Sequence, residues 1–123
     1  AAVDAAAAAV TKRLRDAGDH HCIVSSFSRE VLSTLRPQLS AIPMALIAEV
    51  LPKDGVAFCQ EHGLEGMHLD GHQVTHESAS TLLDAGLALR CYTINEMKEA
   101  QRLFALGVSM IMTDLPERFL ARD

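Results

Sequence analysis

A chain of 123 residues is long enough for one hydrophobic core, and 49% hydrophobic with 22% charged residues is typical of a globular protein. The net charge of −5 argues against a nucleic-acid-binding surface, which needs clustered lysine and arginine. Apolar runs fall short of the roughly 18 residues that predict a membrane span.

The first half of the chain is predicted to alternate helices with short apolar strands. The alanine-rich opening favours a helix, Ser28 is a good helix N-cap, and the run PMALIAEV is typical of a strand buried on both faces. Glycine or proline follows each helical pattern. The predicted segments are a helix over 1–17, a strand over 21–27, a helix over 28–37, a strand over 43–50 and a helix over 52–62.

The second half continues the alternation with clearer boundaries. Thr75 precedes an amphipathic stretch that ends at Gly86, and Asn95 is a predicted N-cap for the helix that follows. Thr113 and Asp114 are expected to start the last helix. The predicted segments are a strand over 66–70, a helix over 75–85, a strand over 87–95, a helix over 96–107, a strand over 108–114 and a helix beginning over 115–123.

The regular spacing of these segments predicts a parallel α/β fold. Strands recur roughly every 21 to 23 residues, and each is followed by a helix, which gives right-handed crossovers. Two architectures fit. One is a flavodoxin-like doubly wound sheet, complete at this size. The other, which we favour, makes residues 1–123 a single segment, the carboxyl-terminal portion of a TIM-type (β/α)8 barrel of roughly 250 residues.

Two features of the sequence favour the barrel over the doubly wound sheet. Polar residues follow several predicted strands, and in a barrel these would surround one mouth, where barrel active sites lie. A phosphate-binding glycine loop after the first strand, typical of doubly wound sheets, is absent from the sequence.

The stretch MHLDGHQVTH contains three of the six histidines and an aspartate, all of them common metal ligands. His68 and Asp70 alternate with apolar residues, so both are predicted to point into the barrel near its mouth. His72 falls in the next loop and His76 in the first turn of the next helix. The alternation of side chains along the strand places His68 and Asp70 on one face, apart from His72 and His76. The spacing of the four residues is no established metal-ligand pattern. We therefore predict no metal site here.

Three further motifs occur in order along the chain: VSSF (24–27), CYTIN (91–95) and GVSMIMTDLPE (107–117). Together they resemble the carboxyl-terminal part of glycerophosphodiester phosphodiesterases. The resemblance covers nearly the whole chain but only about the second half of the family's barrel. Ser109 stands where the family usually carries aspartate, and Tyr92 stands where tryptophan is common.

The resemblance implies a metal-dependent hydrolase that converts small-molecule glycerophosphodiesters to glycerol 3-phosphate and an alcohol. In such enzymes a divalent ion (Mg²⁺ or Ca²⁺) neutralises phosphate oxygens, and a pair of histidines acts as base and acid. The family's His-Arg-Gly, Glu-x-Asp, His-Asp and Glu-x-Lys strand ends have no match in this sequence. The catalytic residues and metal ligands are therefore predicted to lie outside this segment, which alone would be inactive.

Within the segment, the strand ends that match the family motifs supply the candidate substrate-binding residues. Phe27 and Tyr92 are predicted to form an aromatic wall, because pocket linings are usually aromatic with few polar groups. His68 is the third candidate. Arg90 shares strand parity with Tyr92, so it would point into the barrel and would need a carboxylate partner there.

Open strand edges would follow from a half-barrel. Such edges recruit partners, so we expect either the missing amino-terminal half or self-association. The alternative interpretation is a non-catalytic five-unit α/β regulatory or binding domain, and Asp70 alone fits a receiver-like pattern. Three separated cysteines without a CxxC pair favour a reducing, cytoplasmic location over a disulfide framework.

Overall fold

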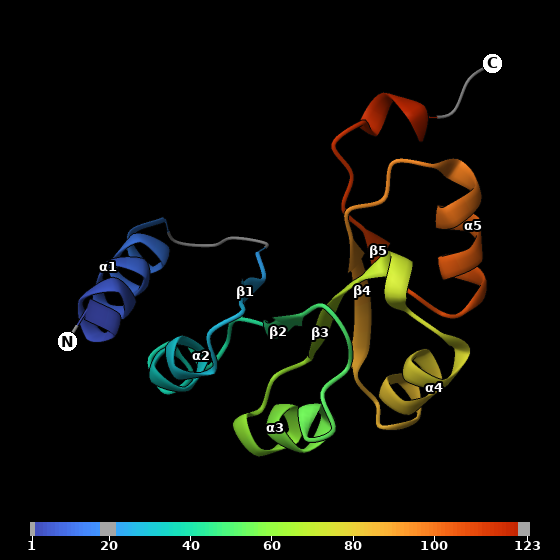
Figure 1. Cartoon of the computed structure of the whole chain (residues 1–123). Coiled ribbons are helices and arrows are strands. Elements are labelled where there is room, and N and C mark those ends of the chain that lie inside the picture. Colours follow the sequence, from blue (N-terminus) through green and yellow to red (C-terminus); the bar gives the residue numbers. More distant parts are fainter. Residues whose placement is uncertain (1, 18–21, 121–123) are drawn as a thin grey trace.

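A computed structural model describes residues 2–17 and 22–120 of the chain (Figure 1). Helices and strands alternate throughout, as the sequence predicts. They are α1 (Ala2–Ala17), β1 (Val24–Ser26), α2 (Arg29–Leu35), β2 (Met44–Ala48), α3 (Gly55–His62), β3 (Gly66–Asp70), α4 (His76–Asp84), β4 (Ala88–Tyr92), α5 (Met97–Ala105) and β5 (Met110–Ile111), with short 3-10 helices η1 (Gly71–Gln73) and η2 (Pro116–Arg118). None of the helices in these residues has the length and apolar character to cross a membrane.

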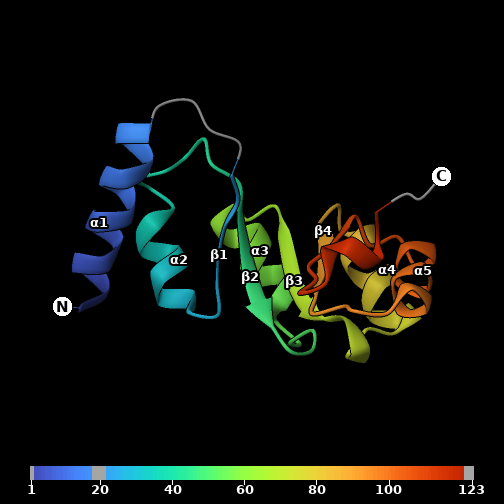
Figure 2. The same cartoon turned by 90° about the horizontal axis from the view of Figure 1, so that it is seen from above.

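The five strands form one parallel sheet in the order β1-β2-β3-β4-β5. A doubly wound sheet reverses its strand order at a switch point, so this sequential order excludes the flavodoxin-like alternative. Right-handed crossovers between sequential strands place every connecting helix on the same face of the sheet. Figure 1 shows α2, α3, α4 and α5 following one another around the outside of the strands, and Figure 2 shows α1 beside α2. The architecture is part of a (β/α) barrel, as predicted.

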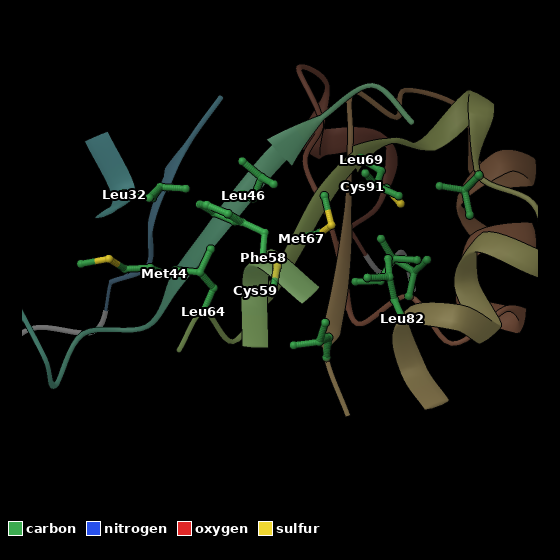
Figure 3. Close-up of a cluster of buried hydrophobic side chains, with 14 of the residues drawn as sticks. Leu32, Met44, Leu46, Phe58, Cys59, Leu64, Met67, Leu69, Leu82 and Cys91 are labelled. Atoms are coloured by element: carbon green, nitrogen blue, oxygen red, sulfur yellow. The ribbon is translucent and has the colours of Figure 1, made fainter. Parts of the chain in front are cut away.

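The hydrophobic core lies between the sheet and these helices. Side chains of Met67 and Leu69 on β3 are 0% and 1% exposed, and they share their side of the sheet with the paired residues of β2 and β4. Figure 3 shows this layer of buried side chains, which includes Leu32, Met44, Leu46, Phe58, Cys59, Leu82 and Cys91.

Alternate residues point to the opposite face, which we call the inner face. Pairing of the strands assigns to it Ala45, Ile47, His68, Asp70, Arg90 and Tyr92. These side chains lie opposite the helices, where a closed barrel has its interior. The inner face carries most of the polar groups of the central strands.

Local sequence signals explain where several helices begin and end. The Ser28 hydroxyl accepts a hydrogen bond from the Val31 amide at the start of α2, as predicted. Thr75 and Ser78 form a reciprocal capping box at the start of α4. Gly63 ends α3 with φ of 65°, a left-handed conformation that glycine adopts without strain.

The predicted ends of several elements are wrong. The outermost strands are shorter than expected: β1 covers three residues of 21–27, of which residue 21 lies outside the described part, and β5 covers two residues of 108–114. The helix expected to begin over 115–123 is the short η2, and residues 121–123 lie outside the described part. α3 begins at Gly55, because residues 52–54 form a turn in which the Gly55 amide bonds the Pro52 carbonyl.

A close approach of two central strands depends on Gly66. A Cβ added at this residue would lie 2.3 Å from the carbonyl oxygen and 3.0 Å from the Cβ of Ala88 on the neighbouring strand. The nearest obstacle is backbone, so the strands themselves would have to separate. A side chain at position 66 is therefore incompatible with the observed β3–β4 pairing.

We predict that Gly66→Ala lowers the free energy of unfolding by about 3 kcal/mol or more, because overpacking against backbone displaces β3 from β4. Gly63→Ala is the matched control: nothing lies within 4 Å of its added Cβ, and only left-handed strain of about 1 kcal/mol is expected. Urea unfolding measures both losses. Equal losses in the two variants would contradict the steric explanation.

Candidate functional site

The carboxyl ends of all five strands lie at one edge of the sheet, because the strands are parallel. At this edge the Phe27 and Tyr92 rings meet edge-to-face, with centroids 6.3 Å apart. Phe27 is 64% exposed, so its ring is accessible at this edge. The two aromatic candidates are therefore neighbours, and they form an exposed apolar wall at the edge.

Tyr92 is the anchored member of this pair. Its hydroxyl donates a hydrogen bond to the Ala48 carbonyl oxygen at 3.1 Å, which ties β4 to the end of β2 across the intervening strand. Burial raises the pKa of the Tyr92 phenol, and the nearby carboxylates of Asp70 and Glu49 raise it further. The phenol consequently stays protonated and can hold this donor bond at neutral pH.

His68 lies one pleat below the same edge. It is 6% exposed and stands directly opposite Arg90 in the β3–β4 register, with 3.4 Å between Arg90 Nη1 and His68 Nε2. Burial lowers the pKa of His68, the Arg90 charge lowers it further, and Glu65 acts in the opposite direction. The ring is held neutral on the inner face.

Arg90 is 8% exposed and forms an ion pair with Glu65, the residue immediately before β3. This meets the predicted need for a carboxylate partner. The pair is incompletely hydrogen-bonded: among residues 2–17 and 22–120 Arg90 Nε has no partner, and Glu65 Oε1 meets Arg90 Nη1 outside hydrogen-bond geometry. The sequence analysis did not identify Glu65. Its position before a strand does not indicate which arginine its side chain will contact.

Asp70 contacts His72, although the sequence predicted that the two residues would lie apart. Its Oδ1 accepts a hydrogen bond from the His72 amide at 3.0 Å and lies 3.4 Å from His72 Nδ1, while Gln73 Nε2 donates to Oδ2 at 3.2 Å. Burial raises the pKa of Asp70, but these hydrogen bonds outweigh burial and hold it below its ordinary value. The alternation of side chains along β3 predicts only the direction of the Asp70 Cβ. From there the carboxylate turns to cap η1.

The histidine-rich stretch does not assemble a ligand cage. Within residues 2–17 and 22–120 the structure shows no group of three or more His, Cys, Asp or Glu side chains arranged to hold a metal ion. The acceptor nitrogen of His68 faces Arg90, and both oxygens of Asp70 accept hydrogen bonds. These nitrogen and oxygen atoms, which would have to bind a metal ion, are already engaged in other contacts. The residues present therefore do not fit a divalent-ion site.

Asn95 has a different role from the predicted helix cap. The N-cap of α5 is Glu96, whereas Asn95 Oδ1 accepts hydrogen bonds from Thr113 Oγ1 at 2.9 Å and the Asp114 amide at 3.0 Å. Thr113 and Asp114 therefore do not start a helix, contrary to prediction. The contact fastens the segment after β5 to the end of β4, which extends the edge beyond the two paired residues of β5.

Comparison with known proteins gives a consistent result. Residues 1–118 match the family model described as the glycerophosphoryl diester phosphodiesterase family. No curated protein matches the sequence. An Oleispira antarctica phosphodiesterase in complex with the product sn-glycerol-3-phosphate is similar in structure, with a TM-score of 0.88 and 19% identity over 94% of this chain and 48% of that chain.

Two further solved structures extend the similarity. A glycerophosphodiester phosphodiesterase from Parabacteroides distasonis has a TM-score of 0.73 and 20% identity over 94% of this chain and 49% of that one. A candidate glycerophosphoryl diester phosphodiesterase from Silicibacter pomeroyi has a TM-score of 0.81 and 23% identity over 95% of this chain and 43% of that one. The chain thus spans about half the length of the solved structures it matches.

The neutral state of His68 predicts a pH dependence of stability. Because its folded pKa lies below the ordinary value of about 6.5, the unfolded chain binds more protons between these two pKa values. The free energy of unfolding should therefore be highest above pH 6.5 and fall as the pH drops through this window. Urea unfolding at a series of pH values measures it.

His68→Asn is the control for this pH effect, since it keeps a polar side chain but removes the titrating ring. Its free energy of unfolding should change less than that of the wild type across the same window. An identical pH slope in the two proteins would show that His68 titrates alike in the folded and unfolded states.

Proposed function

The chain belongs to the glycerophosphoryl diester phosphodiesterase family, and from this we propose that it is part of an enzyme that hydrolyses glycerophosphodiesters to glycerol 3-phosphate and an alcohol. The observation that carries the proposal is the family match, which extends over residues 1–118. The polar and aromatic groups at the carboxyl edge of the sheet support it, since barrel enzymes bind their substrates there.

In this proposal the segment supplies a substrate-binding wall. Phe27 and Tyr92 would contact the apolar parts of the glycerophosphodiester, and His68 would contact a polar part from one pleat below. Their packing supports these roles: the exposed Phe27 ring leans on Tyr92, which the Ala48 carbonyl anchors. Such a combination of apolar walls and a few fixed polar groups is typical of small-molecule sites.

The acid–base groups and the divalent ion would come from elsewhere. The family resemblance implies Mg²⁺ or Ca²⁺, but the described residues of this chain do not fit such an ion, so we assign its ligands to residues outside the chain. Residues 1–123 are thus proposed to be one segment of a partial barrel that lacks the catalytic strands. Within the described sheet, β1 and β5 each pair on one side only, and the missing half would pair there.

The regulatory alternative has less support. A receiver-like domain would need the doubly wound strand order, which the sheet lacks, and a free aspartate at the end of β3. Asp70 occupies that position, but its carboxylate caps η1. A cytoplasmic location is kept as part of the proposal, on the cysteine content alone.

The activity is tested by comparing the full-length protein that carries this segment with the segment alone. The full-length protein should release glycerol 3-phosphate from glycerophosphocholine or glycerophosphoethanolamine in the presence of Mg²⁺ or Ca²⁺, whereas the segment alone should release none. A folded full-length protein that hydrolyses no glycerophosphodiester would refute the proposed activity.

The wall is tested by Phe27→Ala in the full-length protein, which should lower kcat/KM about tenfold, because losing a partly buried aromatic contact costs about 1.4 kcal/mol. Phe27 is exposed, so folding should be unaffected. Phe104→Ala is the matched control, since Phe104 is 49% exposed near the far end of α5. Unchanged kcat/KM in Phe27→Ala would remove this residue from the substrate site.

A further inference from the structure

The contact between Arg90 and His68 determines where the imidazole proton lies. A guanidinium carries only donors, and Arg90 Nη1 is 3.4 Å from His68 Nε2. The Nε2 atom must therefore accept, which leaves the proton of a neutral ring on Nδ1. In the described part of the chain, no hydrogen-bond partner is seen for His68 Nδ1, so its donor is unused.

The groups around His68 favour the neutral imidazole over the protonated one. On the β4 side it faces Arg90, which Glu65 holds from the segment before β3, and on the β2 side its register partner is the uncharged Ile47. Asp70, on the same side of its own strand, is engaged with His72 and Gln73. A protonated ring would add a second cation beside a buried arginine. The neutral ring is consistent with the direction of its pKa shift.

We propose that Arg90, itself held by Glu65, is a positioning residue that fixes His68 as a neutral Nδ1–H donor for an oxygen of the bound glycerophosphodiester. This rests on the proposed function, in which His68 contacts substrate. The three side chains together carry no net charge, because the arginine and glutamate charges cancel. The group offered to the ligand is thus a directed hydrogen bond rather than a positive charge.

This arrangement separates His68 from the usual roles of histidine in phosphodiester chemistry. A general base and a metal ligand both need the imidazole lone pair, and in His68 that lone pair accepts from Arg90. His68 therefore binds and orients, whereas proton transfer and ion binding belong to other residues. Glu65 contributes at a distance, through the orientation of the arginine.

The tautomer is tested directly by long-range ¹H–¹⁵N NMR on the full-length protein with labelled histidine. His68 should show a protonated Nδ1 and an unprotonated Nε2 at pH 7, and its titration should occur below that of ordinary histidine. The reverse tautomer, or a doubly protonated ring at pH 7, would overturn the proposal. Because this measurement uses wild-type protein without substrate, its result does not depend on whether the protein is a phosphodiesterase.

The role of Arg90 is tested in the double variant Glu65→Gln/Arg90→Met, which removes both charges together and avoids an unpaired buried carboxylate. The His68 signals should then lose the fixed Nδ1–H form, while Arg13→Met, a change at an exposed residue of α1, should leave them unaltered. Retention of the same tautomer in the folded double variant would show that Arg90 does not determine it.

Substrate contact is tested by two replacements of His68. His68→Leu should lower kcat/KM about threefold to tenfold, as expected for one lost neutral hydrogen bond, and His68→Asn should recover most of the loss because its amide can donate from a similar position. Equal activity of His68→Leu and wild type would overturn the contact with substrate. If the full-length protein hydrolyses glycerophosphodiesters and His68→Leu is unaffected, the proposed function stands while this inference fails.

Discussion

Residue-by-residue pairing along β2, β3 and β4 decides which side chains share a face of the sheet. Because β3 and β4 run in parallel with Met67 opposite Leu89 and His68 opposite Arg90, one set of alternate residues faces the helices and the other faces inward. A shift of one residue in either strand would bury the arginine among leucines and expose the core. The hydrophobic layer, the polar inner face and the aromatic edge all depend on this register.

Local patterns predicted the parts of the molecule that local forces determine. The bounds of β3 were predicted correctly, because Met67 and Leu69 alternate with His68 and Asp70 in the two-residue period of a strand. The start of α4 followed from Thr75, whose side chain caps its own helix. Asn95 was misassigned because its partners lie 18 and 19 residues ahead, and no signal near position 95 distinguishes a helix cap from such a contact.

The three histidines of one short stretch have three separate structural positions, which composition alone does not distinguish. His68 is buried beside an arginine, His72 lies at the turn that Asp70 caps, and His76 begins α4 as an exposed residue. They are close in sequence because the strand, the turn and the start of the helix follow one another directly along the chain. What sequence reasoning lacked was the side-chain torsion of Asp70 and the reach of Glu65, both of which depend on the packed sheet.

The two outer strands are much shorter than the central ones: β1 has three residues and β5 has two, against five in β2, β3 and β4. A foreign strand that approached either edge would find few main-chain groups in register to bond. The outer strands are therefore poor templates for long β-structure with unrelated chains, although the missing half of the barrel would still pair there. During synthesis and folding, before any partner strand arrives, this protects the chain from aggregation along its open sides.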